Sequence, residues 1–263
     1  MNYIGIIPAR YASTRFPGKP LAMIAGKPMI QRVYEQARKA LDSVVVATDD
    51  SRIYDAVLNF GGEVVMTSHN HKSGTDRCWE AFVKISENSQ MPLDEYVVIN
   101  IQGDEPFIDP LQIELVKAIF ENKTERVEIA TLVSPFTRSD SIEDLLNPNT
   151  PKVAVSSVNN NALYFSRSVI PFLRGVEQSK WIEQIVNDNL FYRHIGMYAY
   201  RADILKQLTA LEQTKLEKTE SLEQLRWLEN GYKIKVASTD IQTHGIDTPE
   251  DIEKTLRILG IKD

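Results

Sequence analysis

A loop rich in cations and hydroxyl groups follows the first apolar run of the chain. It contains Arg10, Ser13, Arg15, Gly18 and Lys19. Each arginine can hold phosphate oxygens through two parallel hydrogen bonds, the lysine adds a point charge, and the glycine lets backbone N–H groups come close to an anion. The loop therefore predicts a site for a ligand that carries phosphate groups. The alternative is a solvated basic loop on the surface.

The spacing of glycines in this loop excludes two common phosphate-binding patterns. Gly18 is the only glycine from Pro8 to Pro20, so the G-x-G-x-x-G fingerprint is absent. Gly18 is followed by Lys19 and Pro20, and no glycine lies five residues before it, so the Walker A pattern is absent as well. Both a dehydrogenase and a P-loop NTPase are therefore disfavoured.

Acidic residues mark two further positions that could do chemistry. Asp104 lies in the polar segment 102–106, which directly follows an apolar run, and Asp247 comes just before a helix start. A carboxylate near a helix start also fits stabilisation by the positive end of the helix dipole, so spacing alone leaves a binding role and a structural role open for Asp247. We expect Glu105 and Asp109 to be ordinary solvated acids.

Short apolar runs alternate with helical spacing over the first hundred residues. We expect strands at 3–7, 43–47, 63–66 and 96–101. Strands separated by helices of this length predict βαβ units and a mostly parallel sheet. Ligands bind beyond the carboxyl ends of such strands, so the basic loop, the segment 48–50 and the segment 102–106 should meet at one edge.

The pattern changes after about Ile129. We expect strands at 129–133, 153–157, 162–166 and 194–200, without regular crossover helices between them. The segment 174–189 is polar and irregular, with Trp181 as its main apolar anchor. Thr248 to Asp251 is typical of a helix start, with a capping hydroxyl, a proline and acidic residues in the first turn. We expect residues 1–131 and 201–263 to form a nucleotide-binding α/β domain, and residues 132–200 to form a smaller substrate-binding or dimerisation lobe.

The composition sets limits on the class of protein. The chain has 263 residues, 43% of them hydrophobic and 25% charged, which is enough apolar material for a core. A net charge of −6 disfavours a nucleic-acid partner and favours a small anionic ligand held by a local cluster of cations. The single cysteine, Cys78, excludes an intrachain disulfide. No apolar run is long enough to span a membrane and the first residues do not resemble a signal peptide, so we expect a cytoplasmic protein without membrane insertion.

The run from Ile7 to Leu21 resembles the signature loop of sugar-activating nucleotidyltransferases. Within that superfamily it is similar to the 3-deoxy-manno-octulosonate (Kdo) cytidylyltransferases, also called CMP-Kdo synthetases. Segments that agree with this family follow in order along essentially the whole chain, at 47–50, 73–77, 100–106, 164–167, 193–200, 220–226 and 244–251. The resemblance implies an α/β, Rossmann-like nucleotide-diphospho-sugar transferase fold, in which helices cover both faces of a mostly parallel sheet.

The same resemblance implies a reaction, in which CTP and Kdo give CMP-Kdo and diphosphate for the synthesis of the lipopolysaccharide core. It implies that Asp104 and Asp247 bind Mg²⁺, and that the protein is a homodimer. Magnesium suits this chemistry because it neutralises phosphate charge, orients the reacting groups and can lower the pKa of a bound hydroxyl.

The resemblance also assigns roles to individual residues. The expected catalytic residues are Arg10, Lys19, Asp104 and Asp247. The expected nucleotide-binding residues are Arg10, Ser13, Arg15, Lys19, Ser73, Gly74, Arg77 and Gln102. The expected sugar-binding residues are Gln102, Arg167, His194, Tyr198, Glu223 and Gln224.

Several of these residues have a structural alternative. Arg77 could pair with the acid beside it at a helix start, and Arg167 could be a cation at a strand edge. His194 could be an ordinary core histidine, while Glu223 and Gln224 could simply be solvated.

Other functions remain open at this point. A sister cytidylyltransferase acting on sialic acid or on 8-amino-Kdo would have much the same phosphate loop, although the residues around Arg167 and His194 match the Kdo family better. A non-catalytic nucleotide-binding protein could share the fold, but the intact cationic loop and both aspartates argue against it. His69 and His71 are expected to be plain loop residues, since their neighbours give no metal-ligand spacing.

Overall fold

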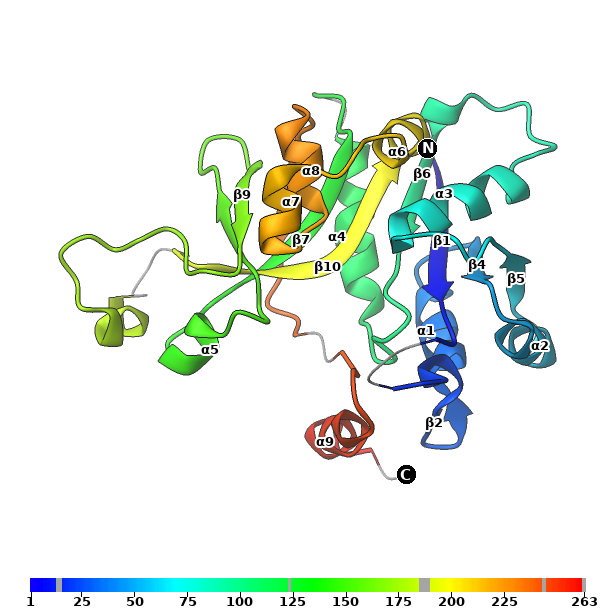
Figure 1. The fold of residues 1–263 in the computed structure, drawn as a ribbon, viewed down its shortest axis with the longest axis horizontal. Coiled ribbons are helices and arrows are strands. Elements are labelled where there is room, and N and C mark those ends of the chain that lie inside the picture. Colours follow the sequence, from blue (N-terminus) through cyan, green and yellow to red (C-terminus); the bar gives the residue numbers. More distant parts are fainter. Residues whose placement is uncertain (13–15, 123, 185–189, 243–244, 262–263) are drawn as a thin grey trace. The chain divides into compact units, whose positions relative to one another are not determined.

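The structure is a computed structural model that describes residues 1–12, 16–122, 124–184, 190–242 and 245–261. The chain folds into two compact units (Figure 1). The first unit contains residues 1–117, 197–209 and 243–263, and the second contains residues 118–196 and 210–242.

The first unit is built on four parallel strands joined by helices. The strands are β1 (Asn2–Ala9), β4 (Val44–Thr48), β5 (Glu63–Met66) and β6 (Tyr96–Asn100), and the connecting helices are α1 (Met29–Ala37), α2 (Ser51–Asn59) and α3 (Gly74–Ile85). The strands lie in the order β5-β4-β1-β6, and the end of β10 (Tyr192–Arg201) adds an antiparallel strand beside β6. Every position of β4 and β6 is buried, as expected for a sheet that is covered on both faces.

The order of the strands explains how the helices cover both faces. The steps from β1 to β4 and from β4 to β5 run in one direction, and the step from β5 to β6 runs back past β1. Because crossovers between parallel strands are right-handed, α1 and α2 lie on one face and α3 on the other. The predicted α/β class with a mostly parallel sheet is confirmed.

Smaller elements complete the first unit. They are the 3-10 helices η1 (Lys19–Leu21) and η2 (Leu93–Glu95), the hairpin β2 (Met23–Ile24) and β3 (Lys27–Pro28), α6 (Ala202–Thr209), α9 (Pro249–Leu259) and the start of α4 (Pro110–Glu121). An apolar cluster of Ile24, Met29, Ile246 and Leu256 packs the hairpin and α1 against α9 and the residues before it. This packing keeps the residues around Asp247 near the loop that leads into η1.

The two helices that begin close to the site both have a capping box. In α3, Ser73 Oγ accepts from the Asp76 N–H and the Asp76 carboxylate accepts from the Ser73 N–H. In α9 the same arrangement joins Thr248 and Asp251, with proline in the first turn. The helix start predicted at Thr248 is therefore confirmed.

The second unit combines short strands and short helices. Its elements are β7 (Ile129–Pro135), α5 (Ile142–Leu146), β8 (Lys152–Val155), β9 (Ala162–Ser166), η3 (Gln178–Lys180), η4 (Ile182–Gln184), the beginning of β10, α7 (Lys215–Glu220), α8 (Gln224–Glu229) and β11 (Ile234–Ser238). Strand β11 is parallel to β7, and β8 pairs antiparallel with both β9 and β10. A small core forms around Phe136, Leu145, Trp181 and Phe191, so the predicted anchor Trp181 is buried.

The boundaries of the compact units differ from those that the sequence suggests. Residues 118–131 and 210–242, expected in the nucleotide-binding domain, belong to the second unit. The reason is strand pairing, because Ile234–Ser238 lies in register beside Ile129–Val133. A return to strand-and-helix alternation near the end of the sequence cannot show which strand the last one will pair with.

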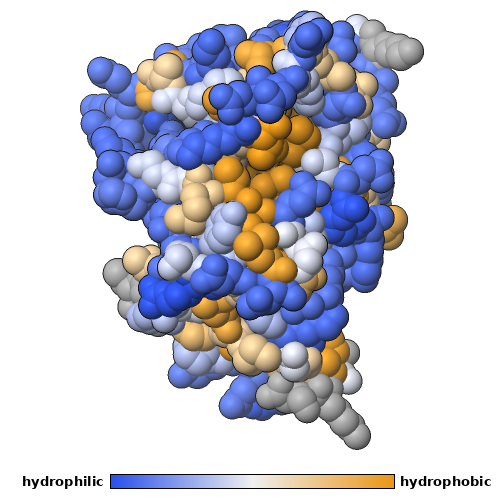
Figure 2. Space-filling model, turned by 90° about the vertical axis from the view of Figure 1, so that its right-hand side faces the viewer, coloured by the Kyte–Doolittle hydropathy of each residue, from blue (hydrophilic) through white to orange (hydrophobic). Residues whose placement is uncertain are grey.

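One face of the first unit carries exposed apolar side chains. Figure 2 looks onto the face with α2, β5 and α3, where hydrophobic side chains gather between hydrophilic ones. The exposed apolar residues of these elements include Leu58, Met66 and Val83. Among the described residues, no helix combines the length and the apolar character needed to cross a membrane.

Candidate active site

The polar segments predicted to share an edge of the sheet do so. Arg10 follows β1, Asp49 follows β4 and Gln102 follows β6, and these three strands are parallel neighbours. The segment after β6 lies against the end of β1, because a Cβ built on Gly103 would lie only 2.9 Å from the Pro8 carbonyl oxygen. Glycine at this position therefore allows the backbone that carries Asp104 to approach β1.

Lys19 and the two singled-out aspartates meet at this edge. Lys19 Nζ lies 2.8 Å from Asp104 Oδ2 and 3.2 Å from Asp247 Oδ1. The backbone adds a further link, since the Ile246 N–H donates to the Asp104 carbonyl at 2.9 Å. The Lys19 side chain is 16% exposed, and those of Asp104 and Asp247 are 34% and 47% exposed. Two carboxylates thus converge on one positive charge at a position open to solvent.

This donor set fits a magnesium ion better than a softer metal. Mg²⁺ prefers oxygen ligands and is commonly held by one or two carboxylates, with waters and substrate phosphates completing its coordination. Among the residues that the structure describes, no group of three or more His, Cys, Asp or Glu side chains could hold a metal. Asp104 and Asp247 would therefore hold the ion only together with ligand and water oxygens.

The carboxylate of Asp247 is not the cap of the helix that follows it. Thr248 and Asp251 form the capping box of α9, and the Asp247 N–H donates to Asp251 Oδ2 at 3.0 Å. The Asp247 side chain instead reaches Lys19. Of the two roles left open by the sequence, the geometry favours the binding role.

Glu105 differs from its expected behaviour. It was predicted to be a solvated acid, which is wrong, because the residue is only 9% exposed and its Oε2 has no hydrogen-bond partner among the described residues. Burial, and then the charge of Asp104, raises the pKa of Glu105 to about 8. Glu105 is therefore mostly uncharged at neutral pH and adds little negative charge beside Asp104. Asp109 is partly buried and accepts from the Leu111 N–H at the start of α4.

Arg10 is oriented by a neutral group. Its Nη2 donates to the carbonyl oxygen of His71, in the segment between β5 and α3. A guanidinium has five N–H donors, so this bond leaves others for an anionic ligand. The other two loop residues assigned to the nucleotide, Ser13 and Arg15, lie outside the described residues.

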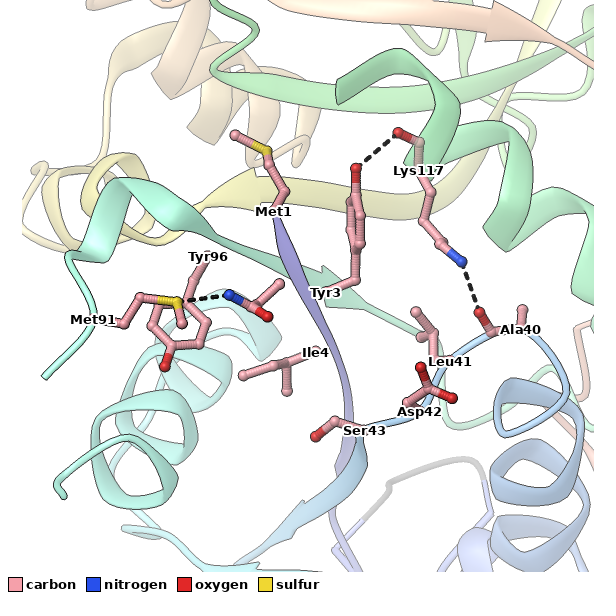
Figure 3. A pocket seen from close by; sticks show the side chains of 11 residues that line it. Met1, Tyr3, Ile4, Ala40, Leu41, Asp42, Ser43, Met91, Tyr96 and Lys117 are labelled. Carbon is pink, nitrogen blue, oxygen red and sulfur yellow. Dashed lines mark hydrogen bonds between the residues drawn. The ribbon is translucent and has the colours of Figure 1, made fainter. Parts of the chain in front are cut away.

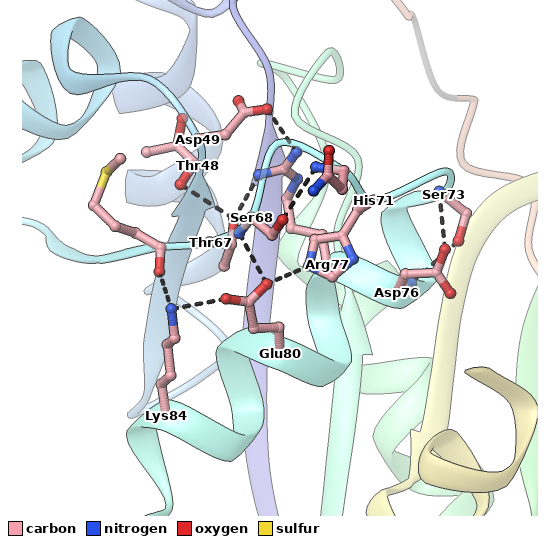
Figure 4. A network of polar contacts seen from close by, with 12 residues as sticks. Thr48, Asp49, Thr67, Ser68, His71, Ser73, Asp76, Arg77, Glu80 and Lys84 are labelled. Carbon is pink, nitrogen blue, oxygen red and sulfur yellow. Dashed lines mark hydrogen bonds and ion pairs between the residues drawn. The ribbon is translucent and has the colours of Figure 1, made fainter. Parts of the chain in front are cut away.

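Of the described cations that are assigned to the site in the first unit, Arg77 is the most deeply buried. Its side chain is 0% exposed, Nη2 lies 3.0 Å from Asp49 Oδ2, and Nη1 donates to Thr67 Oγ1 (Figure 4). Burial lowers the pKa of Arg77 and the Asp49 carboxylate opposes that shift. The expected structural alternative was a pair with the neighbouring acid, but Asp76 instead completes the capping box with Ser73.

The remaining assigned residues of the first unit lie near the same strands. Gly74 begins α3 close to the end of β1, since a Cβ on it would lie 3.4 Å from the Pro8 ring. Gln102 is half-buried directly after β6. Tyr198 is buried on β10, in register with Asn100 of β6, and its ring stacks with Tyr200 at 6.0 Å.

In the second unit, Arg167 is held by backbone carbonyls. Its guanidinium donates to the carbonyls of Glu220 at 2.6 Å, Pro148 at 2.9 Å and Ser221 at 3.3 Å. Its own N–H donates to the Glu220 carboxylate at 2.9 Å. The side chain is therefore fixed in one orientation against the end of α7 instead of lying loosely on a strand edge.

His194, Glu223 and Gln224 also belong to the second unit. The His194 ring packs edge-on against Phe165 at 5.2 Å, and burial lowers its pKa to about 4. Glu223 accepts from Arg226 at 2.5 Å. Gln224 is 4% exposed, and within the described part of the chain its Nε2 has no hydrogen-bond partner, so the alternative that it is a solvated residue is wrong.

Two residues that the sequence did not single out for a role take part in the polar network of Figure 4. Glu80 of α3 contacts the imidazole of His71 and accepts from the Ser68 N–H. His71 lies in a loop, as expected, and its side chain is held there by Glu80. No spacing rule could find the pair, because the contact depends on how the segment 67–73 folds back over α3.

A cavity of about 360 Å³ lies at the other end of β1 (Figure 3). Its wall includes Asn2, Tyr3 and Lys117, and Lys117 Nζ donates to the Ala40 carbonyl at 2.9 Å. In parallel sheets ligands bind beyond the carboxyl ends of the strands, whereas this cavity lies where β1 begins. The cavity is therefore not part of the candidate site.

Known proteins that are similar to this chain are named as cytidylyltransferases, which agrees with a site for a ligand that carries phosphate groups. The family model described as "Cytidylyltransferase" matches residues 4–234. A curated protein of Parabacteroides distasonis named 3-deoxy-manno-octulosonate cytidylyltransferase is 60% identical over 261 residues, covering 99% of both chains. A protein of Bacteroides thetaiotaomicron with the same name is 58% identical over 253 residues, covering 96% of both.

Solved structures are similar over nearly the full length. The structure of a CMP:2-keto-3-deoxy-manno-octonic acid synthetase complexed with CTP matches with a TM-score of 0.83 and 38% identity, covering 99% of both chains. A cytidylyltransferase from Leptospira borgpetersenii matches with a TM-score of 0.59 and 17% identity, covering 97% of this chain and 85% of that one. The second likeness supports the fold alone.

Proposed function

The chain belongs to the family of 3-deoxy-manno-octulosonate cytidylyltransferases, and on that premise we propose that it converts CTP and Kdo to CMP-Kdo and diphosphate. The observation that carries this proposal is the meeting of Lys19, Asp104 and Asp247 at the carboxyl edge of a parallel sheet, the edge at which Arg10 also follows its strand. A nucleoside triphosphate needs both cations and a metal-binding pair of acids, and the site offers both.

The bond changes define what the residues must do. The anomeric hydroxyl oxygen of Kdo forms a bond to the α-phosphorus of CTP, the bond from that phosphorus to the bridging oxygen of diphosphate breaks, and the hydroxyl proton passes to solvent. Phosphoryl-type transfer of this kind depends mainly on positioning and on stabilisation of charge. Arg10 and Lys19, with Ser13 and Arg15 of the same loop, would hold the triphosphate and offset the charge of the departing diphosphate.

We propose Mg²⁺ as the cofactor, held by Asp104 and Asp247. When bound, the ion would neutralise phosphate charge and lower the pKa of a bound hydroxyl. Lys19 lies between the two carboxylates and can release them to a cation of higher charge. Ser73, Gly74, Arg77 and Gln102 remain predicted contacts of the nucleotide.

For the sugar we keep the residues that the resemblance assigns to it. Arg167 is pre-oriented by three carbonyls, which keep its positive charge available for a carboxylate. The Gln224 amide is buried, and among the described residues its Nε2 has no partner, which supports a role in donating to a sugar hydroxyl oxygen. Gln102, His194, Tyr198 and Glu223 stay predictions, as do the homodimer and the cytoplasmic location. Sedimentation analysis of the purified protein would test the dimer.

Purified protein with Mg²⁺, each of the four nucleoside triphosphates, and either Kdo or N-acetylneuraminate tests the reaction through the release of diphosphate. We expect release only with CTP and Kdo. No release with this pair would overturn the proposal, and release with CTP and N-acetylneuraminate alone would assign the chain to the sialic acid reaction.

A further inference from the structure

Glu80 is the centre of a network of polar contacts that reaches beyond its own helix. It lies on α3, and its Oε2 accepts from the Ser68 N–H at 2.9 Å and from the His71 imidazole (Figure 4). Its Oε1 forms an ion pair with Lys84 at 2.7 Å, and Lys84 in turn donates to the Met66 carbonyl at 2.7 Å. The Glu80 carboxylate therefore ties α3 to the segment between β5 and α3 at two points, Ser68 and His71, and Lys84 adds a link to the end of β5.

The contacts of Glu80 keep its carboxylate ionised. Burial would raise its pKa, but the hydrogen bonds from Lys84, Ser68 and His71 lower it to about 2. The Glu80 side chain is 24% exposed and that of His71 is 19% exposed, so both are partly shielded from water. The Glu80 carboxylate is therefore charged at any pH at which the protein would work and can keep accepting these hydrogen bonds.

The same segment carries the group that orients Arg10. The side chain of His71 is held by Glu80, while the backbone carbonyl of His71 accepts from Arg10 Nη2. Fixing the imidazole on one side fixes the direction of the carbonyl on the other. A carbonyl can orient a guanidinium without neutralising it, whereas a carboxylate in that place would reduce its attraction for phosphate.

We propose that Glu80 is a positioning residue for the nucleotide, acting through His71 on Arg10. This inference rests on the proposed function, because it gives Arg10 a triphosphate to hold. Glu80 itself does not touch the ligand. Its role is to hold the His71 carbonyl in the position where it accepts from Arg10. The guanidinium is then oriented before CTP binds.

The test compares CTP binding and steady-state kinetics in Glu80→Ala, Glu80→Gln and a matched control. Glu253→Ala is the control, since it also breaks an ion pair between residues four apart on a helix, with Arg257, but on the exposed surface of α9. We expect Glu80→Ala to raise the Kd and KM for CTP about tenfold, the size of one lost hydrogen bond to a charged group. The KM for Kdo and all constants of the control should stay within about twofold.

Two further comparisons separate positioning from a general structural defect. Glutamine keeps one oxygen that can accept from the Ser68 N–H, so Glu80→Gln should lose less CTP affinity than Glu80→Ala. The glutamine variant also keeps the proposal testable if the alanine variant fails to fold. In an Arg10→Ala background, Glu80→Ala should change the Kd for CTP by less than about twofold, because its effect passes through Arg10. A full tenfold cost in that background would overturn the proposal.

The failure of this proposal can be told from failure of the proposed function. Unchanged CTP binding in Glu80→Ala, with normal binding by the wild-type protein, would overturn the role of Glu80 alone. An equal rise of the KM values for CTP and Kdo would do the same, since it would indicate a general loss of structure. A wild-type protein that does not bind CTP at all would overturn both proposals.

Discussion

Replacing Asp247 with asparagine separates a metal-binding role from a helix-stabilising role at one position. The substitution keeps the shape of the side chain and removes its charge. The cap of α9 should survive, because Thr248 and Asp251 provide it and the Asp247 backbone N–H still donates to Asp251. The lost interaction is the ion pair with Lys19 at 3.2 Å, on a side chain that is 47% exposed.

The expected magnitudes differ strongly between stability and activity. A solvent-exposed ion pair contributes about 0.2–1 kcal/mol to stability. For a chain of this length that is a fall in Tm of about 2 °C. Two unit charges at about 4 Å interact by ~1 kcal/mol even in a water-like dielectric. A divalent ion doubles this figure, so losing one carboxylate should weaken its binding by at least ~2 kcal/mol, which is about 30-fold.

The assay is diphosphate release as a function of Mg²⁺ concentration, together with a thermal melt. We expect Asp247→Asn to need at least about 30-fold more Mg²⁺ for half-maximal rate, with a near-normal Tm. Asp144→Asn is the matched control, an exposed aspartate in the capping box of α5. It should leave the magnesium dependence unchanged. An unchanged magnesium dependence in Asp247→Asn would refute the metal role, and a large fall in Tm would point to the structural role.

Three further substitutions test other parts of the site. Arg77→Met should destabilise the protein by about 3 kcal/mol in urea unfolding, because it leaves Asp49 beside a buried site without its cation; a loss below about 1 kcal/mol would contradict this. Gly103→Ala should cost about 1–3 kcal/mol and raise the Mg²⁺ requirement, since its Cβ would meet the Pro8 carbonyl at 2.9 Å; normal values for both would refute the close approach. The pKa of His194 is lowered from 6.5 to about 4, so the unfolded chain binds the proton more readily, and the free energy of unfolding should fall as pH drops from 6.5 towards 4. His194→Gln should flatten this slope, and a slope that stays the same would count against the burial of His194.

The parallel half of the fold was readable from the sequence because each local signal agreed with the others. Apolar runs marked β1, β4, β5 and β6 to within one or two residues, and Thr248 with Pro249 marked the start of α9. The second unit was harder, because its organisation depends on pairing between distant strands. Nothing local to Ile234–Ser238 shows that it will lie beside β7.

The candidate site shows the same division between local and long-range information. The cationic loop and the segment around Asp104 were placed by the rule that strand ends share an edge, which depends only on strand direction. The raised pKa of Glu105 and the contact between His71 and Glu80 depend on burial and on the path of a loop, neither of which leaves a periodic signal in the sequence. The resemblance to a known family could name the residues of the site, but not the partners that orient them.

The distribution of charge explains how a chain with a net charge of −6 can attract a triphosphate. Lys19, Asp104 and Asp247 together carry one net negative charge, and Glu105 adds little to it at neutral pH because its pKa is raised to about 8. A divalent cation on the two carboxylates would turn this cluster net positive. Arg10, oriented by a neutral carbonyl, adds its full charge at the same edge of the sheet. The attraction for an anionic substrate would thus depend on the metal. Removal of Mg²⁺ should therefore lower the affinity for CTP much more than it would in a site that held the triphosphate with arginine and lysine alone.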